Sequence, residues 1–432
     1  MKKVIFIGSL IFYIIIGLSA AFGETFTLKD LFLLSLEKAE RIKVAQENVL
    51  LAKIGQEKAL APLLPKVAAF STYTEYTQNK RSDTGSLIQP DTAASWGLRI
   101  DESLSLIGRE FIAWESSKEG VEKSKYDLRS YQDDYLIQVA TLFYEVLKAK
   151  RAVDIAKANT ERLTRYREAA QKKLQVGEAT KTALLRAEGE LSGALAEKVR
   201  AENTLKSQQI LLGRLVGLEG PFDIEEESPR DAPRSLEELK RLASQSRPEL
   251  TALKIQKEIA KKQVAFAKGA LWPNVSLSAV YARADQYPPP SNLNRESIYA
   301  TVALNFPFYE GGLRKAEVRE AEIKLKQVEI TEVDTIKNIN AEIEKAYLDY
   351  LTQEGMIKYL KDQLTFAREN YYAVAKQYEY GLASSLDVLD ANNLLLNTEK
   401  QLMETIYNTE LAKVKLKRLS QGLTTELLAD SK

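Results

Sequence analysis

The chain has 432 residues, with 61 basic and 60 acidic side chains and a formal net charge of +1. This balance gives no electrostatic reason to expect nucleic acid as a partner. The sequence contains no cysteine and no histidine, which excludes disulfides, a thiol nucleophile and the commonest general base and metal ligand. It also shows no glycine-rich phosphate loop. We therefore expect no enzyme activity, no cofactor and no bound metal.

Residues 1–23 are expected to form an export signal. Two lysines precede an apolar run from Val4 to Leu18, and small residues follow up to Gly23. This order is typical of a secretory signal peptide cleaved after Gly23, and an uncleaved anchor helix is the alternative. No later stretch has the roughly 18 apolar residues that a membrane helix requires.

Each half of the remaining chain is predicted to open with a shorter helix and then to form two strands. The helices are expected from Thr27 to about Ala61 and from Ser235 to Ala270. The strands are expected at about 66–77, 95–104, 274–283 and 297–306, joined by polar loops over 78–94 and 283–296. Apolar and polar residues alternate in the strands, as they do when one face meets lipid and the other a wet lumen. A half-buried soluble sheet gives the same alternation.

The long helices that follow repeat one pattern at an offset of 204 residues. Apolar residues recur at alternating steps of three and four from Gln132 to Leu174 and again from Ile336 to Tyr378. A seven-residue repeat of this length predicts a long helix in a left-handed coiled coil. The stripes end at Gly177 and Gly381, and 381 − 177 = 204.

A second seven-residue run follows each of these glycines, from Leu184 to Leu215 and from Val388 to Leu419. Glycine readily adopts the positive φ that ends a helix. Each half is therefore predicted to contain one long helical hairpin, with Gly177 or Gly381 at its tip.

The expected domains are the signal peptide, a first repeat over residues 24–217, a linker over 218–234 and a second repeat over 235–432. Four strands cannot close a membrane barrel alone, and an open sheet edge is not tolerated in lipid. Several copies must then share one barrel. Three copies would supply 3 × 4 = 12 strands; two copies would supply eight, the smallest known number.

Several motifs carry a family resemblance. The stretch NFPFYEGG runs from Asn305 to Gly312, and QYEYG from Gln377 to Gly381 is followed by LDVLD from Leu386 to Asp390. In these motifs the chain resembles the TolC-type outer membrane efflux proteins. The first repeat departs from the pattern between Leu104 and Gly108, where it lacks the proline and one glycine. The resemblance implies a mainly α fold with membrane β-strands, assembled as a homotrimer. Its 12-stranded β-barrel would continue into a coiled-coil α-barrel through the periplasm.

The resemblance also implies an outer membrane channel of a tripartite efflux pump or type I secretion system. Outer membrane lipid would surround the barrel, and a periplasmic adaptor (membrane fusion) protein and an inner-membrane pump would be partners. The tips at Gly177 and Gly381 would dock the adaptor. A periplasmic adaptor or a coiled-coil scaffold is the alternative, and the cargo stays open among drugs, metals, dyes and polypeptides.

Asp387 and Asp390 match the acidic pair that lines the periplasmic aperture in this family, and Tyr378 matches a tyrosine near the gate. In a trimer the aspartates would form two carboxylate rings, which favour cations. The first repeat has Ala183 and Arg186 at the corresponding positions, so only the second repeat would build the rings. Simpler roles are also open, since Asp387 fits a helix capping box and Tyr378 continues the apolar stripe.

Overall fold

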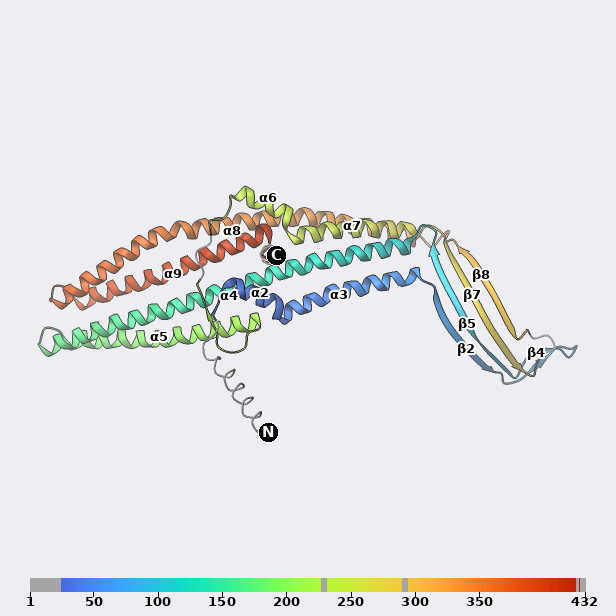
Figure 1. The fold of residues 1–432 in the computed structure, drawn as a ribbon, viewed down its shortest axis with the longest axis horizontal. Coiled ribbons are helices and arrows are strands. Elements are labelled where there is room, and N and C mark those ends of the chain that lie inside the picture. The colour runs from blue at the N-terminus through green and yellow to red at the C-terminus, as the bar shows by residue number, and fades with distance from the viewer. Residues whose placement is uncertain (1–24, 227–230, 290–293, 425–426, 428–432) are drawn as a thin grey trace, which may run out of the picture. The chain divides into compact units, whose positions relative to one another are not determined.

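The computed structural model describes residues 25–226, 231–289, 294–424 and 427 (Figure 1). The predicted signal peptide lies outside the described residues. The helices are α2 (Leu28–Lys38), α3 (Glu40–Leu60), the 3₁₀ turn η1 (Ala61–Leu63), α4 (Arg109–Gln175), α5 (Lys181–Val216), α6 (Leu236–Ser246), α7 (Pro248–Gly269), α8 (Leu313–Glu379) and α9 (Ser385–Gln421). The strands are β1 (Thr25–Phe26), β2 (Lys66–Glu75), β3 (Lys80–Arg81), β4 (Leu87–Gln89), β5 (Thr92–Ser105), β6 (Asp223–Ile224), β7 (Asn274–Tyr287) and β8 (Glu296–Asn305).

The chain divides into two compact units, and the long helices contribute to both. One unit, the hairpin unit, comprises Met1–Ala45, Arg129–Pro248 and Ile336–Lys432. The other, the sheet unit, comprises Gln46–Leu128 and Glu249–Thr335.

In the hairpin unit α5 runs back along α4, and α9 runs back along α8 (Figure 1). Helices α4 and α8 have 67 residues each. All the buried residues of α8 belong to the predicted stripe: Ile339, Ile343, Tyr350, Leu360, Ala367, Tyr371 and Tyr378. The seven-residue repeat therefore marks the buried face of the helix, as expected for a coiled coil.

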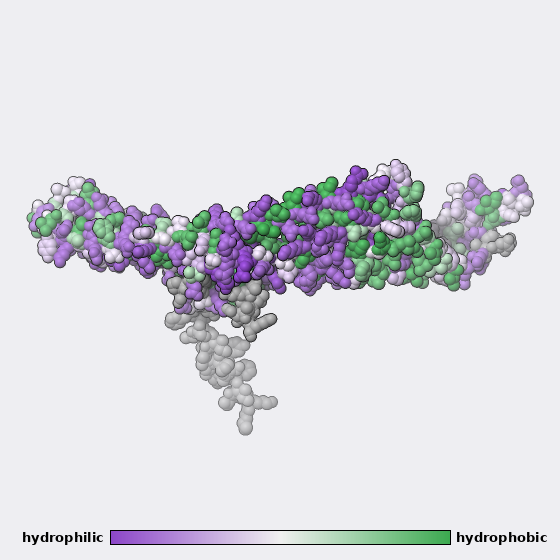
Figure 2. Space-filling model, turned by 90° about the horizontal axis from the view of Figure 1, so that it is seen from above, coloured by the Kyte–Doolittle hydropathy of each residue, from purple (hydrophilic) through white to green (hydrophobic). Residues whose placement is uncertain are grey.

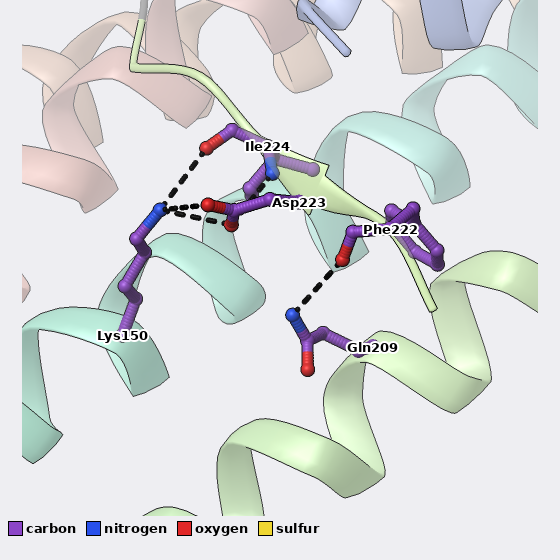
Figure 3. Close-up of polar contacts among 5 residues, drawn as sticks. All are labelled: Lys150, Gln209, Phe222, Asp223 and Ile224. Atoms are coloured by element: carbon purple, nitrogen blue, oxygen red, sulfur yellow. Dashed lines mark hydrogen bonds and ion pairs between the residues drawn. The ribbon is translucent and has the colours of Figure 1, made fainter. Parts of the chain in front are cut away.

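The linker between the repeats is fastened to the first hairpin. Strand β6 pairs in parallel with β1. Figure 3 shows Lys150 of α4 pointing to β6, where its Nζ lies 2.8 Å from both carboxylate oxygens of Asp223 and 3.4 Å from the carbonyl oxygen of Ile224. Gln209 of α5 donates a hydrogen bond to the carbonyl of Phe222 at 3.3 Å. These contacts hold the linker against α4 and α5.

The sheet unit contains one antiparallel four-stranded sheet in the order β2-β5-β7-β8. Its register places large exposed apolar residues on one face: Val67, Tyr73, Trp96, Leu98, Ile100, Leu104, Leu277, Ile298, Val302 and Leu304. The opposite face carries small and polar residues such as Asp101, Ser278 and Thr301. Hydrophobic residues gather where the strands meet the helices (Figure 2). The predicted alternation is thus present, with its apolar face uncovered.

Strands β5 and β7 extend beyond their predicted ends, whereas β2 ends at Glu75 and β8 at Asn305, slightly before theirs. Strand β5 begins at Thr92 and β7 continues to Tyr287, because these two residues still pair with each other. Backbone pairing here outweighs the weak apolar alternation of the sequence. The predicted first loop also contains the short hairpin of β3 and β4. Among the described helices, none is both long enough and apolar enough to cross a membrane.

Two helices predicted as continuous are each broken into two. Arg247 separates α6 from α7 with ψ of 125°, because a residue that precedes proline disfavours the α conformation. Ala39 separates α2 from α3 with ψ of 123°, and no proline follows it. Since 247 − 39 = 208 lies close to the repeat offset, the two breaks are counterparts in the duplication.

Candidate functional site

The candidate site is formed by the two hairpin tips of the hairpin unit. Gly177 and Gly381 have φ of +80° and +76°, a region that residues with a Cβ rarely adopt. The residue after each glycine donates its amide at 2.8 Å to the carbonyl five residues earlier, Lys173 or Gln377. This Schellman pattern ends α4 and α8 in the same way, as the repeat offset predicts.

The helices that leave the tips are capped differently. Thr180 accepts a hydrogen bond from the amide of Ala183 at 3.2 Å, and Ser384 accepts one from the amide of Asp387 at 3.3 Å. Only Asp387 reciprocates, since its Oδ2 accepts from the Ser384 amide at 2.8 Å. The hydrogen bonds from the Ser384 side chain and backbone lower the pKa of the Asp387 carboxyl. The predicted capping box is therefore present in the second repeat.

Asp387 and Asp390 are both exposed near the start of α9. Their spacing of three residues places them on the same side of the helix. Within the described part of the chain, neither forms an ion pair with a basic side chain, and no cluster of three or more carboxylates could hold a metal ion. The two carboxylates are thus presented to solvent rather than tied to α5.

Tyr378 is buried, in contrast to the aspartates. Its ring centroid lies 5.4 Å from that of Tyr166 in α4, and Lys173 Nζ lies 5.6 Å from the Tyr378 ring. Its hydroxyl has no hydrogen-bond partner among the described residues. Burial raises the pKa of the Tyr378 hydroxyl, and the neighbouring Tyr166 raises it further by a smaller amount. In this conformation Tyr378 packs the two tips together.

Four residues that the sequence did not single out also form contacts at the tips. The hydroxyl of Tyr166 forms hydrogen bonds with Ser385, through both its Oγ and its carbonyl oxygen. Lys173 pairs with Glu178 at 3.1 Å. A comparison of the repeats offers a signal, because Tyr166 corresponds to Asn370 (166 + 204) and so departs from the duplicated pattern.

Two helical hairpins in tandem and a sheet with an uncovered apolar face are together the features of a membrane channel protein. Residues 34–218 and 239–421 match the family described as outer membrane efflux protein, and the chain belongs to that family.

Known relatives and a solved structure agree with this assignment. The outer membrane efflux protein BepC of Brucella suis biovar 1 is 24% identical over 303 residues, which cover 70% of this chain and 66% of BepC. The outer membrane protein TolC of Escherichia coli K12 is 23% identical over 398 residues, or 85% and 76% of the two chains. The crystal structure of CusC matches with a TM-score of 0.81 and 18% identity, covering 93% of this chain and 94% of CusC; it shows the fold.

The family assignment confirms the resemblance predicted from the tip and junction motifs. The protein is an outer membrane protein of the channel class that serves efflux or type I secretion. The alternatives of a periplasmic adaptor and a coiled-coil scaffold are set aside, because both repeats match the family along most of their length.

Proposed function

We propose that three copies of the chain assemble into a duct that conducts substrates passively from a periplasmic pump assembly to the exterior. The observation that carries this proposal is the four-stranded sheet. Its edge strands β2 and β8 each have one partner within the described chain, and its apolar face is exposed. In lipid such a sheet must close on further strands. Three sheets side by side complete a 12-stranded barrel, and the helical hairpins of the three copies complete a helical tunnel.

The aperture of this duct is assigned to the second hairpin tip. Asp387 and Asp390 are exposed, and neither forms an ion pair with a basic side chain in the described chain. A threefold axis beside the tip would gather them into two carboxylate rings. Rings of this kind attract cations. Tyr378 would hold the neighbouring helices together beside the aperture through its contact with Tyr166. The capping role of Asp387 is compatible with this assignment, because its carboxylate stays charged while it caps.

The tips are also the proposed docking surface for a periplasmic adaptor that connects the duct to an inner-membrane pump. Val176 beside Gly177, and Tyr380 and Leu382 beside Gly381, are exposed apolar residues at the two turns. Exposed apolar groups at rigid turns are suited to burial by a partner protein.

Conductance across planar lipid bilayers tests the duct and its aperture together. The variant with Asp387→Asn and Asp390→Asn should lose much of the cation preference of the native channel while still conducting. Glu369→Gln removes an exposed carboxylate of α8 about three turns from the tip and serves as the matched control. The aperture assignment is wrong if the double variant keeps the native reversal potential in a salt gradient. Protein that forms no channel at all would contradict the duct.

A further inference from the structure

The sheet unit contains a cavity of about 680 Å³ between α3 and α4, near the end of the four-stranded sheet. This volume lies within the range of sites that bind small molecules. The lining includes Lys53, Glu57 and Leu60 of α3 and Trp114, Lys118 and Glu119 of α4. All of these residues belong to one chain, so the cavity does not depend on how many copies assemble.

Two lysines face each other across this cavity. Helix α3 leads into the sheet and α4 leads out of it, and the Ser124 hydroxyl donates to the Asn48 carbonyl at 3.5 Å. Five residues farther along α3 is Lys53, and five residues back along α4 is Glu119, next to Lys118. Because both helices advance by about 1.5 Å per residue, Lys53 and Lys118 lie at the same level on opposite walls.

Neither lysine is paired with a carboxylate in the described part of the chain. Lys53 forms no ion pair there, and Lys118 Nζ lies 3.3 Å from the centroid of the Trp114 ring. Two positive charges on opposite walls repel each other unless an anion lies between them. A phosphate group fits this position, because its oxygens accept strong hydrogen bonds from lysine.

The cavity also presents carboxylate oxygens that lack partners. Oε1 of Glu119 lies 2.8 Å from Lys262 Nζ, but its buried Oε2 has no hydrogen-bond partner among the described residues. Glu57 forms no ion pair with them either. A wholly anionic ligand would be repelled by these oxygens. An ammonium group beside the phosphate would instead donate hydrogen bonds to them.

The remaining charged residues of the lining do not alter this balance. Glu122 and Lys125 pair with each other at 2.6 Å. The unpaired groups are therefore two lysines and two carboxylates, which suits a ligand that carries both charges.

The cavity begins where the apolar surface of the sheet ends. Phe111, Trp114 and Lys118 follow one side of α4 at spacings of three and four. Phe111 is 49% exposed, and its ring centroid lies 5.6 Å from that of Trp114. The stripe changes from aromatic to basic over about 10 Å. Aromatic and then basic side chains are typical of a membrane interface, where the headgroup layer is about 5–8 Å thick.

We propose that this cavity binds the headgroup of a phospholipid that carries a phosphate and a primary ammonium, from the periplasmic leaflet of the outer membrane. The phosphate lies between Lys53 and Lys118, and the ammonium donates to Glu119 and Glu57. The glycerol end of the lipid lies toward Trp114 and the sheet. Basic pockets between helices at the membrane surface bind headgroups in this way. One bound lipid per chain holds the junction of sheet and helices at a fixed depth in the membrane.

Trp114 serves as a probe inside the site, since the chain has only two other tryptophans. A variant with Trp96→Phe and Trp272→Phe keeps Trp114 alone. Dihexanoyl phosphatidylethanolamine, titrated into this protein in detergent, should shift the Trp114 emission saturably. The phosphatidylcholine and phosphatidylglycerol analogues should bind about tenfold more weakly, because choline has no N–H donor and glycerol has no positive charge. Glycerophosphoethanolamine, which lacks acyl chains, should also bind more weakly than the lipid.

Substitutions in the single-tryptophan protein separate the two halves of the headgroup. Lys53→Gln and Lys118→Gln should each weaken binding about tenfold through loss of a phosphate contact. Glu57→Gln should reduce the preference for ethanolamine over glycerol headgroups. Lys58→Gln removes an exposed lysine of α3 that does not line the cavity, and it should leave binding unchanged. Far-ultraviolet circular dichroism should show the same helix content in all four variants.

The outcomes distinguish the site from its occupant and from the duct. No saturable change at Trp114, equal affinity for the three lipids, or binding indifferent to both cavity lysines would overturn the site. Glycerophosphoethanolamine that binds as tightly as the lipid would overturn the membrane as the source of the ligand. A protein that binds the lipid as expected but forms no channels in planar bilayers would contradict the proposed duct and leave the headgroup site standing.

Discussion

The two hairpins have the same backbone geometry at their turns, but corresponding side chains in them contact different neighbours. Both turns use a glycine at positive φ and the same hydrogen-bond pattern. Yet Arg162 of α4 is buried against Glu399, whereas Phe366 at the same place in α8 is exposed. The comparison teaches that residues which determine the turn were kept in both copies. Residues on the outer faces of the long helices differ between the copies, and so does their exposure.

The largest effect is expected from breaking the ion pair that distinguishes the hairpins. Arg162→Phe should destabilise the protein by about 3 kcal/mol, since it leaves Glu399 buried without its partner. Adding Glu399→Leu to Arg162→Phe places at both positions the apolar residues found at the counterpart positions, Leu195 and Phe366, and should recover most of this loss. Unfolding in detergent, followed by circular dichroism, gives the comparison. A double variant no more stable than the single one would show that the two residues are not coupled.

Replacing the glycine at either tip should cause a smaller loss of stability, and the loss should be the same at both tips. Gly177→Ala and Gly381→Ala should each cost about 1–2 kcal/mol, because alanine at positive φ is strained. No described atom crowds the added Cβ at Gly177, and only Lys173 Nζ approaches it at Gly381, at 4.0 Å. The cost is therefore set by the backbone alone, and the thermal midpoints should fall by similar amounts.

The matched control for the tips is Gly189→Ala, in the interior of α5 with open space around the position. This change should stabilise by about 0.5–1 kcal/mol, because alanine favours a helix interior. Unequal losses at the two tips would refute the equivalence of their backbones.

Removing the N-cap of α9 or of α5 should lower the stability of the protein by amounts that differ by about 1 kcal/mol or less. Ser384→Ala removes a cap that Asp387 reciprocates, whereas Thr180→Ala removes a simple cap. Loss of an N-cap costs about 1 kcal/mol, so the serine change should be the more damaging of the two. Hydrogen exchange of the first-turn amides of α9 and α5 measures each effect locally. The reverse order would contradict the capping box.

The smallest effect concerns pH. The pKa of Asp387 lies below its ordinary value of 3.8 because the folded state hydrogen-bonds the carboxylate. The resulting stabilisation is present above the ordinary value and is lost as the pH falls through the lowered pKa. Amide exchange at the start of α9 should accelerate only in that acidic window. Asp387→Asn should abolish the pH dependence; a loss of protection near neutral pH would be inconsistent with this cap.

Much of the fold could be predicted because it depends on local patterns. The stripe from Ile336 to Tyr378 marks buried positions, and the glycines at 177 and 381 mark the turns. The capping box at Asp387 follows from residue types at fixed spacing. By contrast, the break at Ala39 has no local signal. The bond between Tyr166 and Ser385 joins residues 219 positions apart, and no single stretch of sequence specifies such a contact.

Native mass spectrometry of the detergent-extracted, processed protein tests most directly whether the duplicated chain is completed by copies of itself. The account predicts a single species with three times the mass of the chain, stable only while detergent or lipid covers the strands. A monodisperse single chain that stays folded in detergent-free buffer would contradict it.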